Sequence, residues 1–329
     1  MKSCILKISD KTKKGEYTMY RIQCPACKNN ALVQTSNAYQ CLLCGYLYSD
    51  LLYKKENEIK VMTQEEQTGY ELNQIAQNYF QSVLLNMIKK KHKAVTYLRK
   101  RGFCNQEDIE HFGFGYDNGL LVPYLLKLGY TENQLYYFGL MKYQNDFFNG
   151  RLTVPIKDSV GRIIGFGART LEDDALKYIN TAENPIFAKK AVFFGIYTLN
   201  FQMPIILCEG FFDCISLQKK GFNALATMGT ALTMEHAILL KEINQPLYLA
   251  YDNDKAGQKA IMQNMRLLQS VGLTCKWVYL NDCKDPDEFL HKYEDKEFKK
   301  NIIQAKNRKQ AVLNNLDIAD ITEVIQYLV

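Results

Sequence analysis

The stretch Ile205-Ile206-Leu207-Cys208-Glu209-Gly210-Phe211-Phe212-Asp213 is the clearest indication of the architecture of the C-terminal part of this chain. Its first four residues form an apolar run typical of a buried strand, and Glu209-Gly210 marks the point where the strand ends and a helix begins. Two similar runs follow, from Leu247 to Tyr251 and from Cys275 to Leu280, and we expect a helix from about residue 255 to 271 between them. This alternation predicts an α/β unit, a parallel sheet with helices on its faces.

Acidic residues follow each of these three strands. They are Glu209 and Asp213 after the first strand, Asp252 and Asp254 after the second, and Asp282, Asp285, Asp287 and Glu288 after the third. Because the carboxyl ends of parallel strands meet at one sheet edge, we expect these carboxylates to converge. A single Asp at such a place is more often a helix N-cap or a turn residue. Acidic groups on three strand ends together favour a site for Mg²⁺ or Mn²⁺, of the kind that supports phosphoryl transfer.

The region before this unit predicts a mixed α+β structure. Apolar residues from Leu72 to Ile88 recur at the spacing of one helix face, so we expect an amphipathic helix there, with a basic stretch as its C-terminal end. That stretch, Lys89 to Arg101, holds seven basic residues and no acid. It is compatible with a solvated helix face or with a nucleic-acid contact. Farther on, Leu152 to Ile156 and Ile163 to Phe166 predict a hairpin.

Four of the ten cysteines form two Cys-x-x-Cys pairs near the N-terminus. Cys24 and Cys27 are separated by thirteen residues from Cys41 and Cys44, a spacing that can place four thiolates around one Zn²⁺. A closed set of four ligands leaves no open position, so we expect this zinc to be structural. The surrounding β module is too small to bury a core alone, and metal binding would supply its folding free energy.

Length and composition bound the class of protein. With 329 residues, 47% hydrophobic, 23% charged and a net charge of +6, the chain has globular composition and room for two or three domains. We found no apolar run long enough to span a bilayer and no signal peptide, so we expect a cytoplasmic protein without a membrane partner. The expected divisions are a zinc ribbon (1–55), a linker (56–70), a basic subdomain (71–203), the α/β unit (204–290) and a helical tail (291–329).

The order of these motifs resembles a known family. Strand-Glu209-Gly210-x-x-Asp213 followed by strand-Asp252-x-Asp254 resembles the Toprim domain of bacterial primases, topoisomerases and recombination mediators. Further stretches resemble the RNA-polymerase core of DnaG-type primases, namely Tyr97-Leu98 with Arg101-Gly102, Phe114-Gly115-Tyr116, Gly161 to Arg169, Lys177 to Asn180, Phe187-Ala188-Lys189, Gly229 to Leu232 and Asp285 to Glu288. The resemblance spans roughly residues 20 to 290. It implies a small β zinc ribbon, a mixed subdomain and a Toprim subdomain with a Rossmann-like parallel sheet.

The resemblance also implies roles for individual residues. Glu209, Asp252 and Asp254 would bind catalytic Mg²⁺ or Mn²⁺, with support from Asp213, Asp285 and Asp287. Nucleotide or template would be bound by Arg101, Arg169, Lys177, Asn180 and Lys189. The implied activity is DNA-templated synthesis of short RNA primers from ribonucleoside triphosphates on single-stranded DNA. The implied partner is a separately encoded replicative helicase.

Two departures from the family shape these expectations. Four cysteines replace the usual set with one histidine, which is more like the zinc site of bacteriophage primase-helicases. The chain is also short after Asp287 and has no Walker-type loop, so we expect a compact primase of a phage or mobile element, without a fused helicase or a helicase-binding domain. The alternative is a RecR-like mediator, which joins a zinc ribbon to a Toprim fold and binds DNA without synthesis. A type IA topoisomerase would need more chain.

Overall fold

The structure is a computed structural model that describes residues 62–103, 105–172, 176–229 and 231–305, together with the backbone of five short strands before them. These strands pair antiparallel in chain order, and they are β1 (Lys7–Asp10), β2 (Tyr17–Tyr20), β3 (Leu32–Gln34), β4 (Ala38–Cys41) and β5 (Leu47–Ser49). A small β module is therefore present, as predicted. The expected zinc site lies outside what the structure describes, because no side chain of this region is placed.

A long helix opens the part of the chain that is described in full. Helix α2 (Gln64–Leu85) begins with a capping box in which Thr63 and Glu66 bond each other's backbone amides. It ends at Leu85, followed by a turn, and α3 (Lys93–Lys100) begins separately with the His92 ring accepting from the Ala94 amide. The expectation that the basic stretch ends the first helix is therefore wrong. Its lysines occupy a turn and a second short helix, because the chain is capped anew at His92.

An antiparallel sheet in the order β11-β10-β9-β6 forms the centre of the next region. The predicted hairpin is confirmed as β9 and β10, which pair with a register shift between Ile163 and Gly165. The elements of this region are α4 (Gln106–Phe112), β6 (Gly115–Tyr116), α5 (Leu121–Lys127), α6 (Glu132–Tyr137), β7 (Met141–Lys142), β8 (Asn145–Asp146), β9 (Arg151–Lys157), β10 (Ile163–Thr170), β11 (Tyr178–Asn180) and the 3₁₀ turns η1 (Lys189–Ala191) and η2 (Ile196–Thr198).

The C-terminal unit is a parallel sheet in the order β13-β12-β14-β15. The predicted α/β alternation is confirmed, although the second and third strands are shorter than their apolar runs. The short edge strand β13 was not predicted. The elements are β12 (Ile205–Cys208), α7 (Phe211–Lys219), β13 (Ala224–Ala226), α8 (Met234–Ile243), β14 (Leu247–Leu249), α9 (Lys255–Ser270), β15 (Cys275–Trp277), α10 (Pro286–Lys292) and α11 (Asp295–Ile303).

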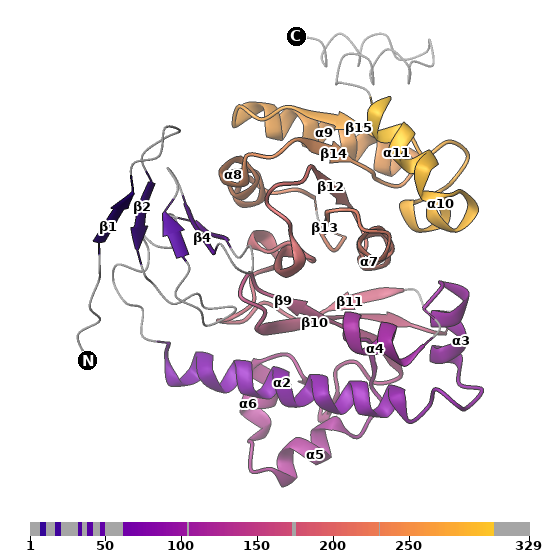
Figure 1. Cartoon of the computed structure of the whole chain (residues 1–329). Coiled ribbons are helices and arrows are strands. Elements are labelled where there is room, and N and C mark those ends of the chain that lie inside the picture. Colours follow the sequence, from indigo (N-terminus) through magenta and orange to yellow (C-terminus); the bar gives the residue numbers. More distant parts are fainter. Residues whose placement is uncertain are drawn as a thin grey trace.

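Alternation along β12 explains why helices cover both faces of the parallel sheet. Ile205 and Leu207 belong to a buried cluster with residues of α8 and α9, whereas Ile206 and Cys208 belong to another with α7 and α10. Figure 1 shows α7 between the two sheets, with α2 on the far side of the antiparallel one. None of the helices among the described residues combines the length and apolarity of a bilayer span.

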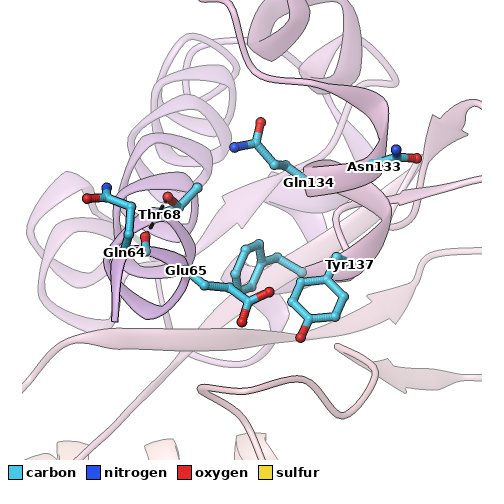
Figure 2. A pocket seen from close by; sticks show the side chains of 7 residues that line it. Gln64, Glu65, Thr68, Asn133, Gln134 and Tyr137 are labelled. Carbon is cyan, nitrogen blue, oxygen red and sulfur yellow. Dashed lines mark hydrogen bonds between the residues drawn. The ribbon is translucent and has the colours of Figure 1, made fainter. Parts of the chain in front are cut away.

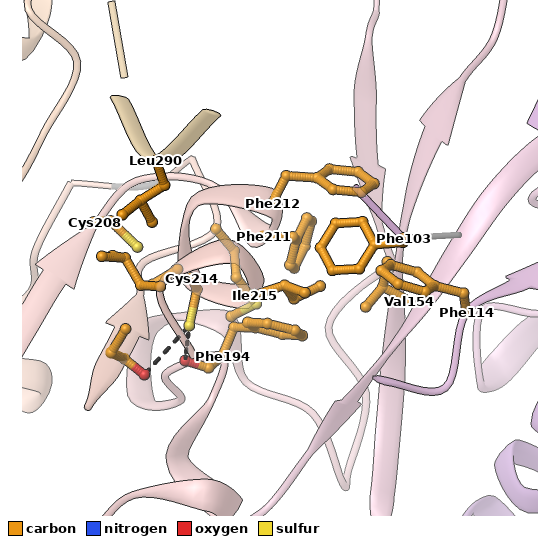
Figure 3. Close-up of a cluster of buried hydrophobic side chains, with 14 of the residues drawn as sticks. Phe103, Phe114, Val154, Phe194, Cys208, Phe211, Phe212, Cys214, Ile215 and Leu290 are labelled. Carbon is orange, nitrogen blue, oxygen red and sulfur yellow. Dashed lines mark hydrogen bonds between the residues drawn. The ribbon is translucent and has the colours of Figure 1, made fainter. Parts of the chain in front are cut away.

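The cluster around α7 joins the two sheets into one core. Phe211 and Phe212, in the first turn of α7, point toward Phe103, Phe114 and neighbouring side chains of the antiparallel layer (Figure 3). The Phe114 and Phe212 rings stack with centroids 5.9 Å apart. Burying these aromatic rings fixes the start of α7, and therefore the adjoining strand end, against the antiparallel layer.

Candidate active site

Carboxylates from three strand ends face one another at the carboxyl edge of the parallel sheet. Glu209 follows β12 directly, Asp252 lies three residues after β14, and Asp285 is the N-cap of α10 after β15. Burial is the largest cause that raises the pKa of Glu209, to about 7, and the charges of Asp252 and Asp254 raise it further. The pKa of Asp252 is likewise raised by burial and then by Asp285. Such mutual effects require the charges to be close.

Asp213 lies at the back of this group. Its side chain is buried, and burial followed by the charges of Asp285, Asp252 and Asp287 raises its pKa well above the ordinary value. The backbone amide of Asp287 donates to Asp213 Oδ1 over 3.2 Å. The first turn of α10 is thereby held against the first turn of α7, so that the acids after β12 and β15 share one site.

Asp254 lies at the exposed rim, where it caps α9 by accepting from the Gly257 amide over 2.8 Å. A Cβ on Gly257 would lie 2.0 Å from the carbonyl oxygen of Asp252, so only glycine permits this close approach. Gly257 was not predicted as part of the site, although Asp254 before a helix is a recognisable N-cap signal. This glycine fixes the loop that carries Asp252 and Asp254.

Two of the acids after β15 do not join the group. Asp282 accepts from the Lys292 ammonium and from the Tyr293 hydroxyl, and these bonds lower its pKa to about 2. Glu288 accepts from the Lys284 amide over 2.6 Å. The expectation that all four acids after this strand converge is therefore too broad.

The carboxylate group has the chemistry of a divalent-ion site that is open rather than closed. Among the described residues, no three His, Cys, Asp or Glu side chains are close enough to enclose a metal ion unaided. Mg²⁺ needs only one or two carboxylates, because waters and substrate phosphates complete its coordination. Glu209 Oε1 is buried without a hydrogen-bond partner in the described part of the chain. Lys284, 3.8 Å from Asp252, is the nearby cation. The residues present therefore fit such an ion.

The predicted basic residues differ in what they contact. Arg101 forms an ion pair with the buried carboxylate of Asp287, which also accepts from the Ser216 hydroxyl. Arg169, on β10, donates to the Tyr178 hydroxyl over 2.6 Å, and its Nε is buried without a partner among the described residues. The charge of Arg101 is therefore balanced by Asp287, whereas no carboxylate forms an ion pair with Arg169 in the described part of the chain. The sequence reading missed Ser216.

The remaining predicted residues lie on β11 and in the segment after it. Lys177, just before β11, is exposed, and Lys189, in η1, is half-buried with its pKa lowered by burial. Asn180 Nδ2 donates to the Met228 carbonyl over 3.4 Å, and its Oδ1 is buried without a partner in the described residues. The amide of Gly229 in turn donates to the Glu209 carbonyl. Hydrogen bonds thus connect β11 to the strand end that carries the first acid.

Close packing between β10 and α7 brings the basic and acidic groups together. A Cβ on Gly167 would lie 2.1 Å from the Phe211 ring, so this glycine lets β10 approach the start of α7. Gly167 pairs with Asn180, and Arg169 pairs with Tyr178 on the same two strands. The strand pair that carries Arg169 and Asn180 therefore lies beside Glu209-Gly210.

One pocket among the described residues lies elsewhere and holds none of the predicted residues. It has a volume of about 460 Å³ and lies between the start of α2 and α6 (Figure 2). Glu65 is its only charged residue, and the others are Gln64, Thr68, Asn133, Gln134, Tyr137 and Phe138. A site for phosphates needs cations, so this pocket is not part of the candidate site.

Comparisons with known proteins agree with this arrangement. The family described as DNA primase catalytic core, N-terminal domain, matches residues 79–200, and the Toprim-like family matches residues 206–290. A DNA primase of Clostridium acetobutylicum is 35% identical over 277 residues, which are 79% of this chain and 45% of that protein. The chain thus spans about half the length of the curated relatives it matches.

Solved structures show the same similarity. The zinc-binding and RNA polymerase domains of the Aquifex aeolicus primase are 26% identical, with a TM-score of 0.69 over 97% of this chain and 86% of that one. The DnaG primase catalytic domain bound to single-stranded DNA is 29% identical, with a TM-score of 0.67 over 77% of this chain and 84% of that one. The mixed fold and the parallel sheet predicted from the sequence are confirmed.

Proposed function

Because this chain belongs to the DnaG-type primase family, we propose that it is a DNA primase, an enzyme that makes short RNA primers on single-stranded DNA. The substrates would be ribonucleoside triphosphates, joined by metal-dependent nucleotidyl transfer. One observation supports this proposal above the others. Half-buried carboxylates from separate strand ends lie so close that Asp252 raises the pKa of Glu209 and Asp285 raises that of Asp252, beside the strand pair that carries Arg169.

The acidic group would hold Mg²⁺ or Mn²⁺ through Glu209, Asp252 and Asp254. When bound, such ions would activate the primer 3′-hydroxyl and stabilise negative charge on the transferred phosphate and on pyrophosphate. Asp213 and Asp285 would support these ligands, because both carboxylates lie close enough to Asp252 for their charges to interact with it. The unpartnered Glu209 oxygen supports an incoming cation, because a buried acceptor without a donor is otherwise unfavourable.

The basic group would orient phosphates. Arg169, Lys177 and Lys189 would contact nucleotide triphosphate or template backbone, since guanidinium groups bind phosphate oxygens in pairs and ammonium groups act as point charges. Asn180 would contribute the free acceptor of its side-chain amide, while its donor stays on the Met228 carbonyl. The pairing of Arg101 with Asp287 favours a structural role for that arginine.

The N-terminal module and the partners belong to the same proposal. Cys24, Cys27, Cys41 and Cys44 would bind one structural Zn²⁺, as their spacing indicates. The zinc module would hold the template strand, and a separately encoded replicative helicase would deliver it. The helicase partner is inferred from the family resemblance alone. The structural neighbour bound to single-stranded DNA supports a single-stranded template here.

A RecR-like mediator without synthesis activity is not favoured. The match to the primase catalytic core covers residues 79–200, the region in which such a mediator has no need of Arg169, Lys177 and Lys189.

The test is primer synthesis by the full chain. The protein is incubated with single-stranded DNA, four ribonucleotides and Mg²⁺ or Mn²⁺, and labelled products are separated by size. We expect short RNA oligomers that depend on template and divalent ion. DNA binding without oligomers, on a panel of templates and with either ion, would contradict the proposal and would favour a mediator.

A further inference from the structure

Two arginines and three aromatic rings form a continuous row beside the candidate site. The Arg169 guanidinium carbon lies 4.9 Å from the Tyr178 ring centroid and 4.7 Å from that of Tyr97. The Arg101 guanidinium carbon lies 5.0 Å from the same Tyr97 ring and 4.7 Å from that of Phe212. Tyr97 is therefore shared by both cations, and the row connects β11 and β10 to α3 and α7.

The two cations of this row are not equivalent. Arg101 is tied to Asp287 by an ion pair. The Arg169 guanidinium lies over two tyrosine rings and donates to the Tyr178 hydroxyl, and its buried Nε has no acceptor among the described residues. A planar guanidinium held between two rings keeps its outer N–H groups in a fixed direction while its charge stays uncompensated.

The Tyr97 ring is held in place independently of Arg169. It packs edge-on against Phe212 at 5.5 Å, and α3, which carries Tyr97, is anchored through Ala94, Val95 and Leu98 in the core. The Tyr97 hydroxyl is buried and lies close to the Tyr178 hydroxyl. Both guanidinium groups lie over the ring of Tyr97, so we expect the ring to be the part that orients them.

We propose that Tyr97 is a positioning residue that presents Arg169, and not Arg101, as the cation that binds a phosphate of the nucleotide or of the template. This inference rests on the proposed function and adds to it a division of roles between two arginines. Without the Tyr97 ring, Arg169 would keep only its contacts with Tyr178 and would be oriented less tightly. Arg101 would stay attached to Asp287.

A double-mutant cycle tests this inference. The variants are Tyr97→Leu, Arg169→Ala and the combination, with KM for ribonucleotide and kcat measured during primer synthesis, and Kd measured for an oligo-dT strand. We expect Tyr97→Leu and Arg169→Ala each to raise either the nucleotide KM or the DNA Kd about tenfold, with kcat changed less than about threefold. The double variant should be no worse than Arg169→Ala. Which constant rises identifies the source of the phosphate.

Control variants separate positioning from general damage. Tyr97→Phe keeps the ring that both arginines contact and should therefore behave like the unchanged protein. Tyr70→Leu removes a ring that lies 4.3 Å from Arg162, away from this row, and should leave both constants unchanged. Three results would overturn the inference. The first is a double variant whose loss is the product of the two single losses, and the second is a fall in kcat with the nucleotide KM and the DNA Kd unchanged. The third is a Tyr97→Phe variant that loses as much as Tyr97→Leu.

Failure of the proposed function can be distinguished from failure of this inference. If the unchanged protein makes no RNA, the proposed function fails, and the same cycle is measured as Kd for inorganic triphosphate and for oligo-dT by calorimetry. Non-additive losses in those constants would still support the role of Tyr97, and additive losses would overturn it.

Discussion

Arg101 and Asp287 form an ion pair that joins α3 to the first turn of α10, across 186 positions of sequence. The Asp287 side chain is 8% exposed and that of Arg101 is 23% exposed, so the pair is mostly withdrawn from water. The Asp287 carboxylate also accepts from the Ser216 hydroxyl, and the Asp287 backbone amide donates to the Asp213 carboxylate. Arg101, which belongs to the basic stretch, thus stabilises the group of carboxylates through Asp287.

Removing Arg101 should destabilise the protein more than removing an exposed cation. Arg101→Ala leaves a buried carboxylate without its cation, so we expect the free energy of unfolding to fall by about 3 kcal/mol. Lys300→Ala, which breaks an exposed pair with Glu297, should cost less than about 1 kcal/mol. Urea unfolding followed by circular dichroism measures both. Equal losses would mean that the buried pair contributes no more than a surface contact.

The pH dependence of stability should depend on a second buried acid, Asp117. Burial, followed by Asp146, raises the pKa of Asp117 to about 8, while Asp146 accepts from the amides of Leu121 and Val122. The folded state therefore keeps a proton that the unfolded state releases near pH 3.8. The stability contributed by this group is full below that pH and is lost as the pH rises toward 8.

Asp117→Asn should weaken this pH dependence, because an amide cannot release a proton. We expect the difference in unfolding free energy between pH 5 and pH 8 to shrink by more than about 1 kcal/mol in the variant. Denaturant unfolding at a series of pH values gives the two curves. Parallel curves for the variant and the unchanged protein would show that Asp117 titrates in its ordinary range.

Gly257 should be required for activity although it carries no side chain. Gly257→Ala would place a Cβ against the Asp252 carbonyl, so we expect a loss of about 1–3 kcal/mol in stability and a tenfold or larger fall in primer synthesis. Ala256→Gly, on the exposed side of the same turn, should cost about 1 kcal/mol through helix propensity and preserve activity. If Gly257→Ala has full activity, the loop of Asp252 and Asp254 does not need this close approach.

The four paired cysteines should bind one zinc ion per chain. Elemental analysis of the purified protein should find that ratio, and Cys41→Ser should lower it, since the remaining ligands hold the metal weakly. Cys275→Ser is the control, because Cys275 is a free and partly buried cysteine of the parallel sheet. Full zinc content after Cys41→Ser would contradict the four-cysteine site.

Local patterns were sufficient to predict most of the fold and part of the site. The apolar run before Glu209 and the one before Asp252 identified two parallel strands and the acids at their ends, because both signals lie within a few neighbouring residues. The end of α2 at Leu85 was not predicted, since apolar residues of the helical period continue into the turn after it. The strand β13 (Ala224–Ala226) was not predicted, because three apolar residues are too few to indicate a strand.

Contacts between distant residues could not be predicted from the sequence. Arg101 was expected to bind nucleotide or template, and its pairing with Asp287 depends on how α3 packs against α10. Asp282 was predicted to be one of the converging acids, but it instead forms an exposed ion pair with Lys292, ten positions later. In both cases the tertiary arrangement determines the partner, and no local pattern in the sequence encodes that arrangement.

In the proposed function, acids on separate strand ends hold the divalent ion used for RNA synthesis. The most direct measurement compares the rate of primer synthesis by Asp252→Asn, Glu209→Gln and Asp282→Asn, with Mn²⁺ binding measured by electron paramagnetic resonance on the same samples. We predict that the first two variants lose at least about a hundredfold in rate and bind Mn²⁺ more weakly. Asp282→Asn should match the unchanged protein in both measurements. Full activity and unchanged Mn²⁺ binding in Asp252→Asn and Glu209→Gln would contradict the claim.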